Sequence, residues 1–439
     1  MNKMHKIEVT GGSPLSGQVQ VSGFKHAFPP LFSLALSSNQ PSLIKNVPDI
    51  ADIRILGKIG QLLGADIVYE PEKRAMYIDP RSLNNSNIPG DLSALIHGAW
   101  YLAPGLLART GHIVLGETGG CKIGGGQEGE RPIEQLCSVL QRFGATVKAE
   151  GNIIQATAQR FSSARIDMAD FAVPEEGTDK LTGPLYSGAT KAALLCAARA
   201  EGISEIINPY PKPDVVALVE AIKCQQVAIQ WEKNRIIIEG KPEAGGFETT
   251  IGPDLIEVMT YLTLSTYCHA PISITNVSRK HIETGLSAEI ACLEKLGYLL
   301  QWQGNNLSIA HVSPASRLDI QVTSHGIFSD NQPFMALLLM ASEQGGSLTE
   351  QVWVKRFQYI EELEKMGAKI IRSGRTVEIM PGVPGKSGIT VNATDLRGAA
   401  ALVIAALQIS GKTQIGGVDH LERGYPDLLG QLRLLGAKV

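Results

Sequence analysis

The chain has 439 residues, a formal net charge of −3 at pH 7, 44% hydrophobic residues and 19% charged residues. This length exceeds one ordinary hydrophobic core and predicts two domains, and the composition is that of a globular protein without long disordered segments. Because there is no surplus of basic residues, we do not expect the chain to bind nucleic acid or an anionic membrane surface.

The first residues, MNKMHKIEV, lead almost directly into a strand-like run and contain no apolar signal core. The longest apolar runs, AAALVIAALQI and PFMALLLMA, are about half as long as a membrane span. The six cysteines are scattered without a C-x-x-C pair, and the nine histidines show no metal-ligating spacing. The sequence therefore predicts a cytoplasmic protein with reduced thiols, no metal and no cofactor.

One pattern recurs along the chain: an amphipathic helix ends at a glycine and is followed by a short strand. The residues at the helix ends are Gly64, Gly144, Gln226, Gly297, Gly367 and Gly436. A glycine there is expected in the left-handed conformation, which ends the helix, and the hydrophobic period then changes from helical to alternating. Gln226 marks a degenerate copy. For any single copy, a common helix ending that recurs by chance is the alternative.

The spacing divides these copies into two sets of three. The first three lie about 80 residues apart and the last three about 70 residues apart. The turn-rich stretch GKPEAGGFETTIGP places a boundary near residues 240–252. The sequence predicts an α/β protein of two domains with three similar units each, and the cleft between such domains is the default place for a ligand.

Five short motifs stand out in chain order. They are VSGFKHA (21–27), GGCKIG (119–124), ERP (130–132), ATDLRGAAAL (393–402) and ERGY (422–425). Each motif is weak alone, but the ordered set spans the chain and resembles the enolpyruvyl transferase family. Within that family it is most similar to the UDP-N-acetylglucosamine 1-carboxyvinyltransferase branch, as a divergent member. The shikimate-pathway branch has a Gly-Asn-Ala-Gly-Thr segment and no cysteine loop, whereas this chain has the cysteine and lacks that segment.

The resemblance implies a fold of two inverse α/β barrel domains, each of three β-α-β-α-β-β repeats, with a cleft between them. One domain is expected to comprise residues 1–23 and 250–439. The other, residues 24–249, is expected to carry the cysteine loop. A monomer or a small homo-oligomer is expected.

The family moves the carboxyvinyl group of phosphoenolpyruvate to a hydroxyl and releases phosphate. Phosphoenolpyruvate carries a phosphate and a carboxylate, and the guanidinium fork of arginine binds either group in a bidentate way. The resemblance assigns phosphoenolpyruvate binding to Lys25, Arg131, Arg356, Arg397 and Arg423. For any one of these cations, a solvated surface charge is the alternative.

Catalytic roles implied by the resemblance fall on Cys121, Asp330, Lys25 and Asp395. Cys121 would act as the acid toward C3 of phosphoenolpyruvate and can also bond to C2. Asp330 would be the base that faces the accepting hydroxyl, and Asp395 would be a further active-site acid. The alternatives are an ordinary loop residue for Cys121, a carboxylate stabilised by a helix dipole for Asp330 and a helix cap for Asp395.

The acceptor side keeps part of the family's pattern. The resemblance assigns acceptor contacts to His26, Arg131, Pro132, Ile133, Glu134, Tyr186, Ser187, Gly188 and Asp330. Ile133 and Glu134 stand where the family has a Val-Asp pair that contacts uracil.

The acceptor side also departs from the family at four places. His26 stands where an Asn is usual, Ile96 where an Arg precedes Trp100, and Pro184 where a Lys is usual. The fourth departure is GGQEGE, which lengthens the spacing between the cysteine and the arginine by five residues. Each lost contact of a cation with a diphosphate is worth about 1.5–3 kcal/mol.

The sequence therefore predicts a uridine nucleotide as acceptor. The first candidate is the 3-hydroxyl of UDP-N-acetylglucosamine in peptidoglycan precursor synthesis. The alternative is uridine monophosphate or a related nucleotide in nucleoside-antibiotic biosynthesis. A third hypothesis is a non-catalytic paralogue. It is disfavoured because the chain retains Cys121, Asp330 and the arginines.

Overall fold

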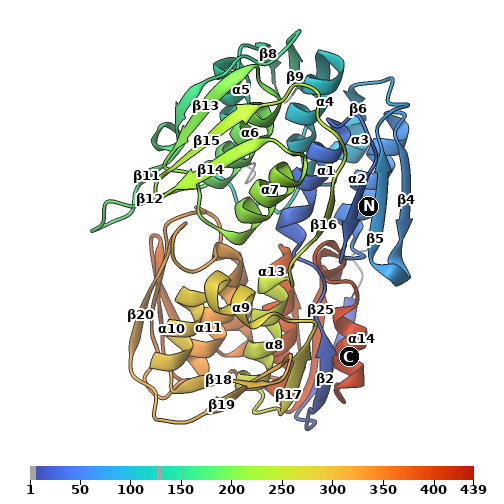
Figure 1. Cartoon of the computed structure of the whole chain (residues 1–439). Helices are drawn as coiled ribbons and strands as arrows, with labels where there is room; N and C mark the ends of the chain where they lie inside the picture. The colour runs from blue at the N-terminus through green and yellow to red at the C-terminus, as the bar shows by residue number, and fades with distance from the viewer. Residues whose placement is uncertain (1–5, 126–130, 152) are drawn as a thin grey trace. The chain divides into compact units, whose positions relative to one another are not determined.

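The computed structural model describes residues 6–125, 131–151 and 153–439. Its contacts divide the chain into two compact units, which are described separately (Figure 1). The described residues of unit 1 are 6–22, 121–125 and 253–439, and those of unit 2 are 23–120, 131–151 and 153–252.

Unit 2 alternates helices and short strands. Its helices are α1 (Phe28–Leu36), α2 (Ala51–Leu62), α3 (Gly90–Ser93), α4 (Leu102–Thr110), α5 (Glu134–Arg142), α6 (Tyr186–Arg199) and α7 (Pro213–Cys224). Its 3₁₀ turns are η1 (Lys25–Ala27), η2 (Pro71–Lys73), η3 (His97–Tyr101) and η4 (Met168–Phe171). Its strands are β3 (Ser42–Lys45), β4 (Asp66–Glu70), β5 (Ala75–Asp79), β6 (Asn87–Ile88), β7 (His112–Leu115), β8 (Thr146–Glu150), β9 (Ile153–Thr157), β10 (Arg165–Asp167), β11 (Val173–Pro174), β12 (Leu181–Thr182), β13 (Gly202–Ile207), β14 (Ala228–Glu232), β15 (Arg235–Gly240) and β16 (Glu248–Thr250).

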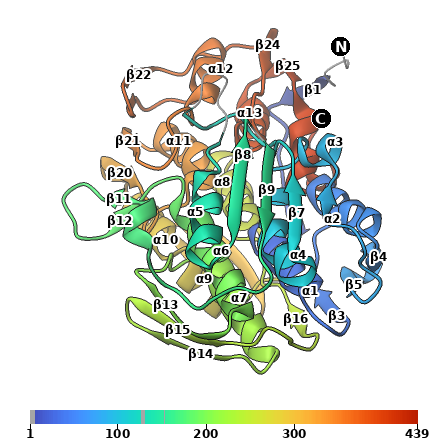
Figure 2. The same cartoon turned by 90° about the horizontal axis from the view of Figure 1, so that it is seen from above.

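The core of unit 2 is built on three helices, α1, α4 and α6, which pack against one another (Figure 2). Every residue of α1 is buried, and so are nearly all residues of α6. A helix that is apolar on all sides must be enclosed by other elements, and the sheets of the unit provide that cover. The four-stranded sheets have the orders β16-β3-β5-β4, β6-β7-β9-β8 and β10-β13-β15-β14.

Unit 1 contains elements of the same kinds. Its helices and 3₁₀ turns are α8 (Leu255–Tyr267), α9 (Arg279–Gly285), α10 (Ser287–Lys295), η5 (Ser329–Asn331), α11 (Gln332–Ala341), α12 (Gln358–Met366), α13 (Leu396–Gln408), η6 (Val418–Arg423) and α14 (Leu428–Leu434). Its strands are β1 (Lys6–Gly11), β2 (Gly17–Gln20), β17 (Ile272–Thr275), β18 (Tyr298–Gln303), β19 (Asn306–His311), β20 (Leu318–Val322), β21 (Gly346–Glu350), β22 (Ile370–Ser373), β23 (Thr376–Ile379), β24 (Ile389–Asn392) and β25 (Gly411–Gly416).

The core of unit 1 is also a set of three helices, α8, α11 and α13, which contact one another. All of α8 is buried, as are nearly all residues of α11 and α13. The surrounding sheets have the orders β18-β19-β17-β2, β20-β21-β23-β22 and β1-β25-β24. Because α11 and α13 are core helices, the residues at their N-terminal ends have fixed positions in this unit.

Among the described residues, six of the seven sheets share one pairing pattern, and the seventh is the two-stranded antiparallel sheet β11-β12. Each of the six contains a parallel pair, such as β20 with β21 or β6 with β7, and one strand of that pair has an antiparallel neighbour. In the five four-stranded sheets a second antiparallel strand follows. In the three-stranded sheet, Lys438 bridges Thr10 of β1 in antiparallel orientation at the corresponding place.

The residues predicted to end the six repeated helices have left-handed backbones. The φ angles are 95° at Gly64, 88° at Gly144, 57° at Gln226, 84° at Gly297, 108° at Gly367 and 102° at Gly436. The predicted conformation is therefore confirmed at all six positions, including the degenerate copy, where Gln226 adopts a conformation that favours glycine.

Within the described ranges, no helix combines the length and the hydropathy that crossing a bilayer would require.

Candidate active site

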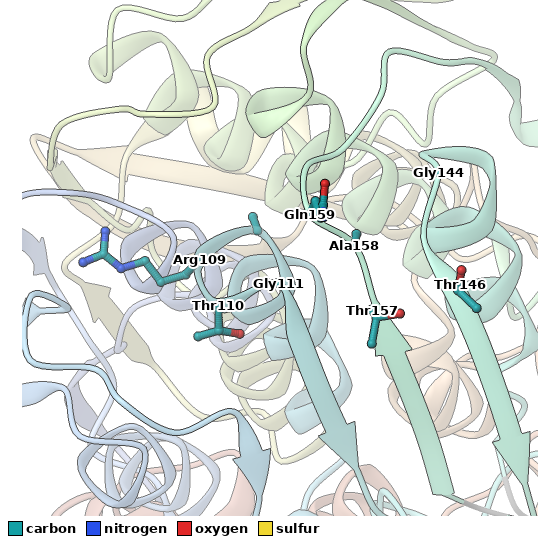
Figure 3. Close-up of a pocket in the computed structure, with 9 residues that line it drawn as sticks. Arg109, Thr110, Gly111, Gly144, Thr146, Thr157, Ala158 and Gln159 are labelled. Atoms are coloured by element: carbon teal, nitrogen blue, oxygen red, sulfur yellow. The ribbon is translucent and has the colours of Figure 1, made fainter.

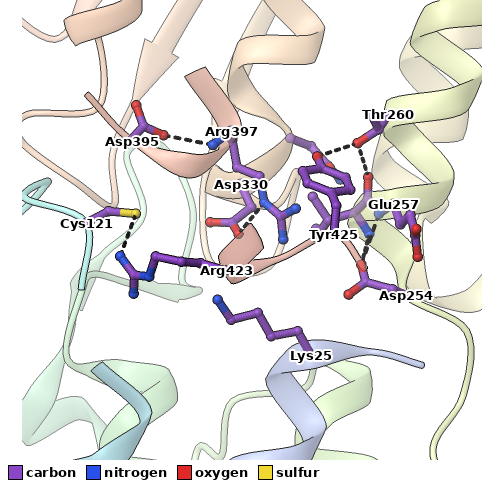
Figure 4. Close-up of polar contacts among 12 residues, drawn as sticks. Lys25, Cys121, Asp254, Glu257, Thr260, Asp330, Asp395, Arg397, Arg423 and Tyr425 are labelled. Carbon is purple, nitrogen blue, oxygen red and sulfur yellow. Dashed lines mark hydrogen bonds and ion pairs between the residues drawn. The ribbon is translucent and has the colours of Figure 1, made fainter. Parts of the chain in front are cut away.

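One carboxylate in unit 1 holds two buried arginines (Figure 4). Asp330 lies in η5, directly before α11, and its Oδ1 accepts a hydrogen bond from Nη2 of Arg356 at 2.8 Å. Its Oδ2 accepts from Nε of Arg397, in the first turn of α13, at 3.0 Å. The side chain of Asp330 is 21% exposed, whereas those of Arg356 and Arg397 are 2% and 1% exposed.

The charges of these groups support one another. Burial disfavours the charged form of both arginines, but nearby acidic groups outweigh this effect. Asp330 and Asp395 raise the pKa of Arg356. Tyr425 and Asp330 raise the pKa of Arg397. The guanidinium of Arg397 also lies over the ring of Tyr425, 5.2 Å from its centroid. The two arginines are therefore permanently charged although they are enclosed.

The same two arginines retain hydrogen-bonding capacity. Among the residues that the structure describes, Nη1 and Nη2 of Arg397 and Nε of Arg356 have no hydrogen-bond partner, although all three atoms are buried. A buried donor without an acceptor is costly. Two nitrogens at one end of a guanidinium match a phosphate or a carboxylate. The geometry therefore fits an anionic ligand.

Asp395 is the N-terminal cap of α13. Its Oδ1 accepts hydrogen bonds from the backbone N–H groups of Arg397 and Gly398, at 3.0 and 3.1 Å. The helix-cap interpretation of Asp395 is therefore confirmed, and its role as an active-site acid stays a prediction. As the cap, Asp395 fixes the turn that carries Arg397.

The described part of the cysteine loop, residues 121–125, has its contacts in unit 1. Nη1 of Arg423, at the end of η6, donates to Sγ of Cys121 at 3.8 Å (Figure 4). The carbonyl of Ile123 accepts from the N–H of Lys355 at 3.3 Å. The cysteine thus lies beside one of the predicted phosphoenolpyruvate-binding arginines. The five-residue lengthening, GGQEGE, falls almost wholly on 126–130, outside the described residues.

A second buried network, which was not predicted from the sequence, lies next to Arg397. The hydroxyl of Tyr425 pairs with Oγ1 of Thr260 on α8 at 2.8 Å. One turn earlier on α8, Oε2 of Glu257 accepts from the N–H and the Oγ of Ser22, at 2.6 and 2.8 Å. Burial, with a smaller effect from the charge of Asp254, raises the pKa of Glu257 to about 7.

Unit 2 carries the remaining predicted residues. Nζ of Lys25, in η1, forms an ion pair with Asp52 at 2.8 Å. The ring of His26 is tilted against that of Phe24, with centroids 5.2 Å apart. Arg131, Pro132 and Ile133 are half-buried directly before α5, and Glu134 is the exposed first residue of that helix.

The first turn of α6 holds the last three predicted acceptor residues. Ser187 is half-buried, but Tyr186 is buried, and its hydroxyl donates toward the carbonyls of Asn208 and Pro209 at 2.9 and 3.1 Å. A Cβ at Gly188 would lie 2.7 Å from the ring of Trp100, so a larger residue at this position would clash with that ring. Tyr186 and Gly188 therefore have structural roles, and their acceptor contacts stay predictions.

The structure also shows the surroundings of Ile96 and Pro184, two of the residues that depart from the family pattern. Ile96 is 0% exposed, so its side chain belongs to the core of unit 2. Pro184, before α6, is exposed. Neither position supplies a cation.

A buried ion pair in unit 2 was missed by the sequence reasoning. Nζ of Lys191, on α6, lies 2.5 Å from Oδ2 of Asp214 and 5.0 Å from the ring centroid of Tyr101. Burial opposes the charge of Lys191, but Asp214 outweighs it, and the lysine's pKa is raised. The signal available in the sequence was a lysine within an otherwise apolar helix.

Unit 2 also contains a pocket of about 630 Å³ that is separate from the predicted site residues (Figure 3). Its lining residues include Gly111, which follows α4, Gly144, which lies between α5 and β8, and Thr157, the last residue of β9. It contains none of the predicted site residues. The described residues contain no group of three or more His, Cys, Asp or Glu side chains that could hold a metal ion.

Comparison with known proteins agrees with this geometry. The family model described as EPSP synthase (3-phosphoshikimate 1-carboxyvinyltransferase) matches residues 9–432. The chain belongs to the enolpyruvyl transferase family. It is an enzyme of the phosphoenolpyruvate-dependent carboxyvinyltransferase class, as the sequence motifs predicted.

Several relatives match over nearly the whole chain. UDP-N-acetylglucosamine 1-carboxyvinyltransferase 3 of Caldanaerobacter subterraneus subsp. tengcongensis is 32% identical over 438 residues, 99% of each chain. The enolpyruvyl transferase NikO from Streptomyces tendae is 33% identical with a TM-score of 0.91, over 99% of this chain and 98% of that one. An EPSP synthase structure from Acinetobacter baumannii has a TM-score of 0.70 at 16% identity, over 98% of each chain, and supports the mixed α/β fold alone.

Proposed function

We propose that this enzyme transfers the carboxyvinyl group of phosphoenolpyruvate to a hydroxyl of a uridine nucleotide and releases phosphate. The observation that carries the proposal is the cluster of Asp330, Arg356 and Arg397, in which buried guanidinium donors are available next to a carboxylate. Phosphoenolpyruvate would use those donors, and the carboxylate would act on the second substrate.

The cations divide the binding work. In unit 1, the two Nη atoms of Arg397 and Nε of Arg356 would bind one anionic group of phosphoenolpyruvate, and Arg423 would contribute a further donor beside Cys121. In unit 2, Lys25 and Arg131 stay predicted phosphoenolpyruvate-binding residues. Several donors fixed before the substrate arrives stabilise negative charge at little cost in reorganisation.

The proton transfers follow from the positions of the side chains. Arg356 and Arg397 fix the carboxylate of Asp330, which would act as the general base and take the proton of the accepting hydroxyl as that oxygen attacks C2. Cys121 would give a proton to C3, and Arg423 would stabilise the thiolate. The Cys121 thiolate would then take a proton back from C3 of the tetrahedral intermediate, the C2–O bond to phosphate would break, and the C2–C3 double bond would re-form as phosphate leaves.

For the acceptor, the residues of unit 2 favour uridine monophosphate. A diphosphate linker would need cations where this chain has the enclosed side chain of Ile96 and the exposed Pro184. A mononucleotide carries one phosphate and does not need both. UDP-N-acetylglucosamine is the second candidate, because the curated relatives named for that acceptor match 99% of the chain.

We also propose the finer architecture implied by the family. The six sheets with their common pairing would be six β-α-β-α-β-β repeats, three in each of two inverse α/β barrels. Residues 1–23 with 250–439 would form one folding domain, and residues 24–249 the other.

The test compares phosphate release from phosphoenolpyruvate with uridine monophosphate, with UDP-N-acetylglucosamine and without acceptor. We expect acceptor-dependent release with a higher kcat/KM for uridine monophosphate. A higher kcat/KM for the sugar nucleotide would reverse the order of the two candidates. No release with either nucleotide would refute the proposed function.

A further inference from the structure

A further carboxylate in unit 1, that of Glu350, lies near the Asp330–Arg356 pair and has no role in the mechanism above. It is the last residue of β21 and is 1% exposed. Its Oε1 accepts hydrogen bonds from the N–H groups of Val352 and Trp353, at 2.8 and 3.1 Å. Its Oε2 accepts from the hydroxyl of Ser329 at 2.7 Å.

The donors to Glu350 belong to two different active-site segments. Ser329 directly precedes Asp330 in η5. Val352 and Trp353 open the segment that carries Arg356 and leads into α12. One buried carboxylate thus joins the turn that presents the proposed base to the segment that presents its arginine partner.

The same segment also receives the cysteine loop. The N–H of Lys355 donates to the carbonyl of Ile123, and Nε2 of Gln358 donates to the carbonyl of Lys122 at 3.4 Å. The backbone to which Glu350 bonds therefore continues into the surface that Cys121 and its neighbours contact.

The backbone of Glu350 is itself fixed. Its N–H donates to the carbonyl of Arg375 at 2.9 Å, and its carbonyl accepts from Nε of Arg375 at 2.6 Å. Burial raises the pKa of the Glu350 carboxyl, while the bonds from Ser329 and from the two backbone N–H groups favour the ionised form. Because the backbone of Glu350 is fixed in this way, its side chain can hold Ser329, Val352 and Trp353 in one geometry.

We propose that Glu350 is a positioning residue, which sets the separation of Asp330 and Arg356 by binding both of their segments. The inference rests on the proposed function, because it assigns catalytic meaning to that separation. A displacement of about 1 Å in such a pair can lower the rate by a factor of about 100.

Three variants separate the two links. Ser329→Ala removes only the donor to Oε2, and Glu350→Ala removes both links. Glu350→Gln keeps the shape, because its Oε1 can accept from the two N–H groups and its amide can donate to Ser329. The matched control is Thr349→Val on the same strand, which removes a 2.8 Å hydroxyl contact with Thr376 of β23 and leaves the Glu350 carboxylate intact.

The expected kinetic results differ for the two links. Ser329→Ala should lower kcat by about tenfold with an unchanged KM for phosphoenolpyruvate, because only the Asp330 turn is released. Glu350→Ala should lower kcat by at least as much and also raise that KM, because the Arg356 segment is released too. Glu350→Gln should stay within about threefold of the parent enzyme, as should Thr349→Val.

The proposal is overturned if the parent enzyme turns over and both Ser329→Ala and Glu350→Ala match Thr349→Val in kcat and KM. If the parent enzyme releases no phosphate, the proposed function fails, and crystal structures of the variants decide the positioning role alone. An Asp330–Arg356 contact that stays at 2.8 Å in Glu350→Ala would refute that role, and a broken contact would support it.

Discussion

Replacing Asp330 by asparagine tests the central cluster most sharply. Asparagine keeps the shape of the side chain and can still accept from one arginine, but its amide presents donors to the other. Two enclosed guanidinium groups, on Arg356 and Arg397, would then lose their carboxylate. Breaking a buried ion pair costs about 3–5 kcal/mol, and because Asp330 is 21% exposed we expect about 3 kcal/mol, at the lower end.

The stability of unit 1 should reflect this cost. A loss of about 3 kcal/mol corresponds to a fall of roughly 6–12 °C in Tm for a unit of this size. Inorganic phosphate should restore part of the loss, because an added anion binds the folded state at the two unpaired guanidinium groups. The matched control is Glu283→Gln, which breaks an exposed ion pair with Arg279 at 2.8 Å and should cost at most about 1 kcal/mol.

Scanning calorimetry with and without phosphate, together with phosphate-release kinetics, measures both effects. Loss of a general base should lower kcat by a factor of about 100 to 10,000. If Asp330→Asn has the Tm of Glu283→Gln, the carboxylate does not hold the arginines. If it retains the parent kcat, Asp330 is not the base.

Substitutions at three residues test other parts of the protein. Cys121→Ala should lower kcat by a factor of about 100 or more in the phosphate-release assay. Cys121→Asp should keep more of the activity, because an aspartic acid can also donate a proton. Full activity of the alanine variant would exclude the thiol from the mechanism. Arg397→Lys should raise the KM for phosphoenolpyruvate at least tenfold, because an ammonium cannot replace the bidentate fork; an unchanged KM would exclude Arg397 from the binding site. The pKa of Glu257 is raised from 4.5 to about 7 in the folded protein, so the folded state binds this proton more tightly than the unfolded state. The contribution of this group to the free energy of unfolding is therefore fully present below about pH 4.5 and is lost as the pH rises through 7. Denaturant unfolding should therefore show the parent protein losing roughly 3 kcal/mol relative to Glu257→Gln between pH 5 and pH 8, and parallel stability curves for the two proteins would show that this carboxyl does not titrate there.

The repeated helix ends and the cluster residues could be predicted because their signals are local. A glycine after an amphipathic helix implies a left-handed C′ residue, and even Gln226 adopts that conformation. Arg397 lies in the motif ATDLRGAAAL, and the family resemblance assigned Asp330 and Arg356, although the contacts of the three residues join segments far apart in the chain. The resemblance named the residues, and the three packed core helices of unit 1 bring two of the segments together.

The supporting residues could not be predicted, because their partners are distant in sequence. Glu350 is the last residue of an ordinary strand, and in the sequence it resembles a surface charge, because its partners Ser329 and Val352 are identified only in the structure. Glu257 bonds to Ser22, which lies 235 residues away. The family resemblance assigned Tyr186 to the acceptor, which stays a prediction, and the bonds of its hydroxyl to the carbonyls of Asn208 and Pro209 were not predicted.

Identification of the reaction product tests the proposed function most directly. Phosphoenolpyruvate, uridine monophosphate and the enzyme are incubated, and the nucleotide is analysed by mass spectrometry and proton NMR, with UDP-N-acetylglucosamine in a parallel reaction. We predict a uridine nucleotide in which a carboxyvinyl group replaces one hydroxyl hydrogen, with one phosphate released per product. Unmodified nucleotides in both reactions, with phosphoenolpyruvate intact, would contradict the proposed transfer.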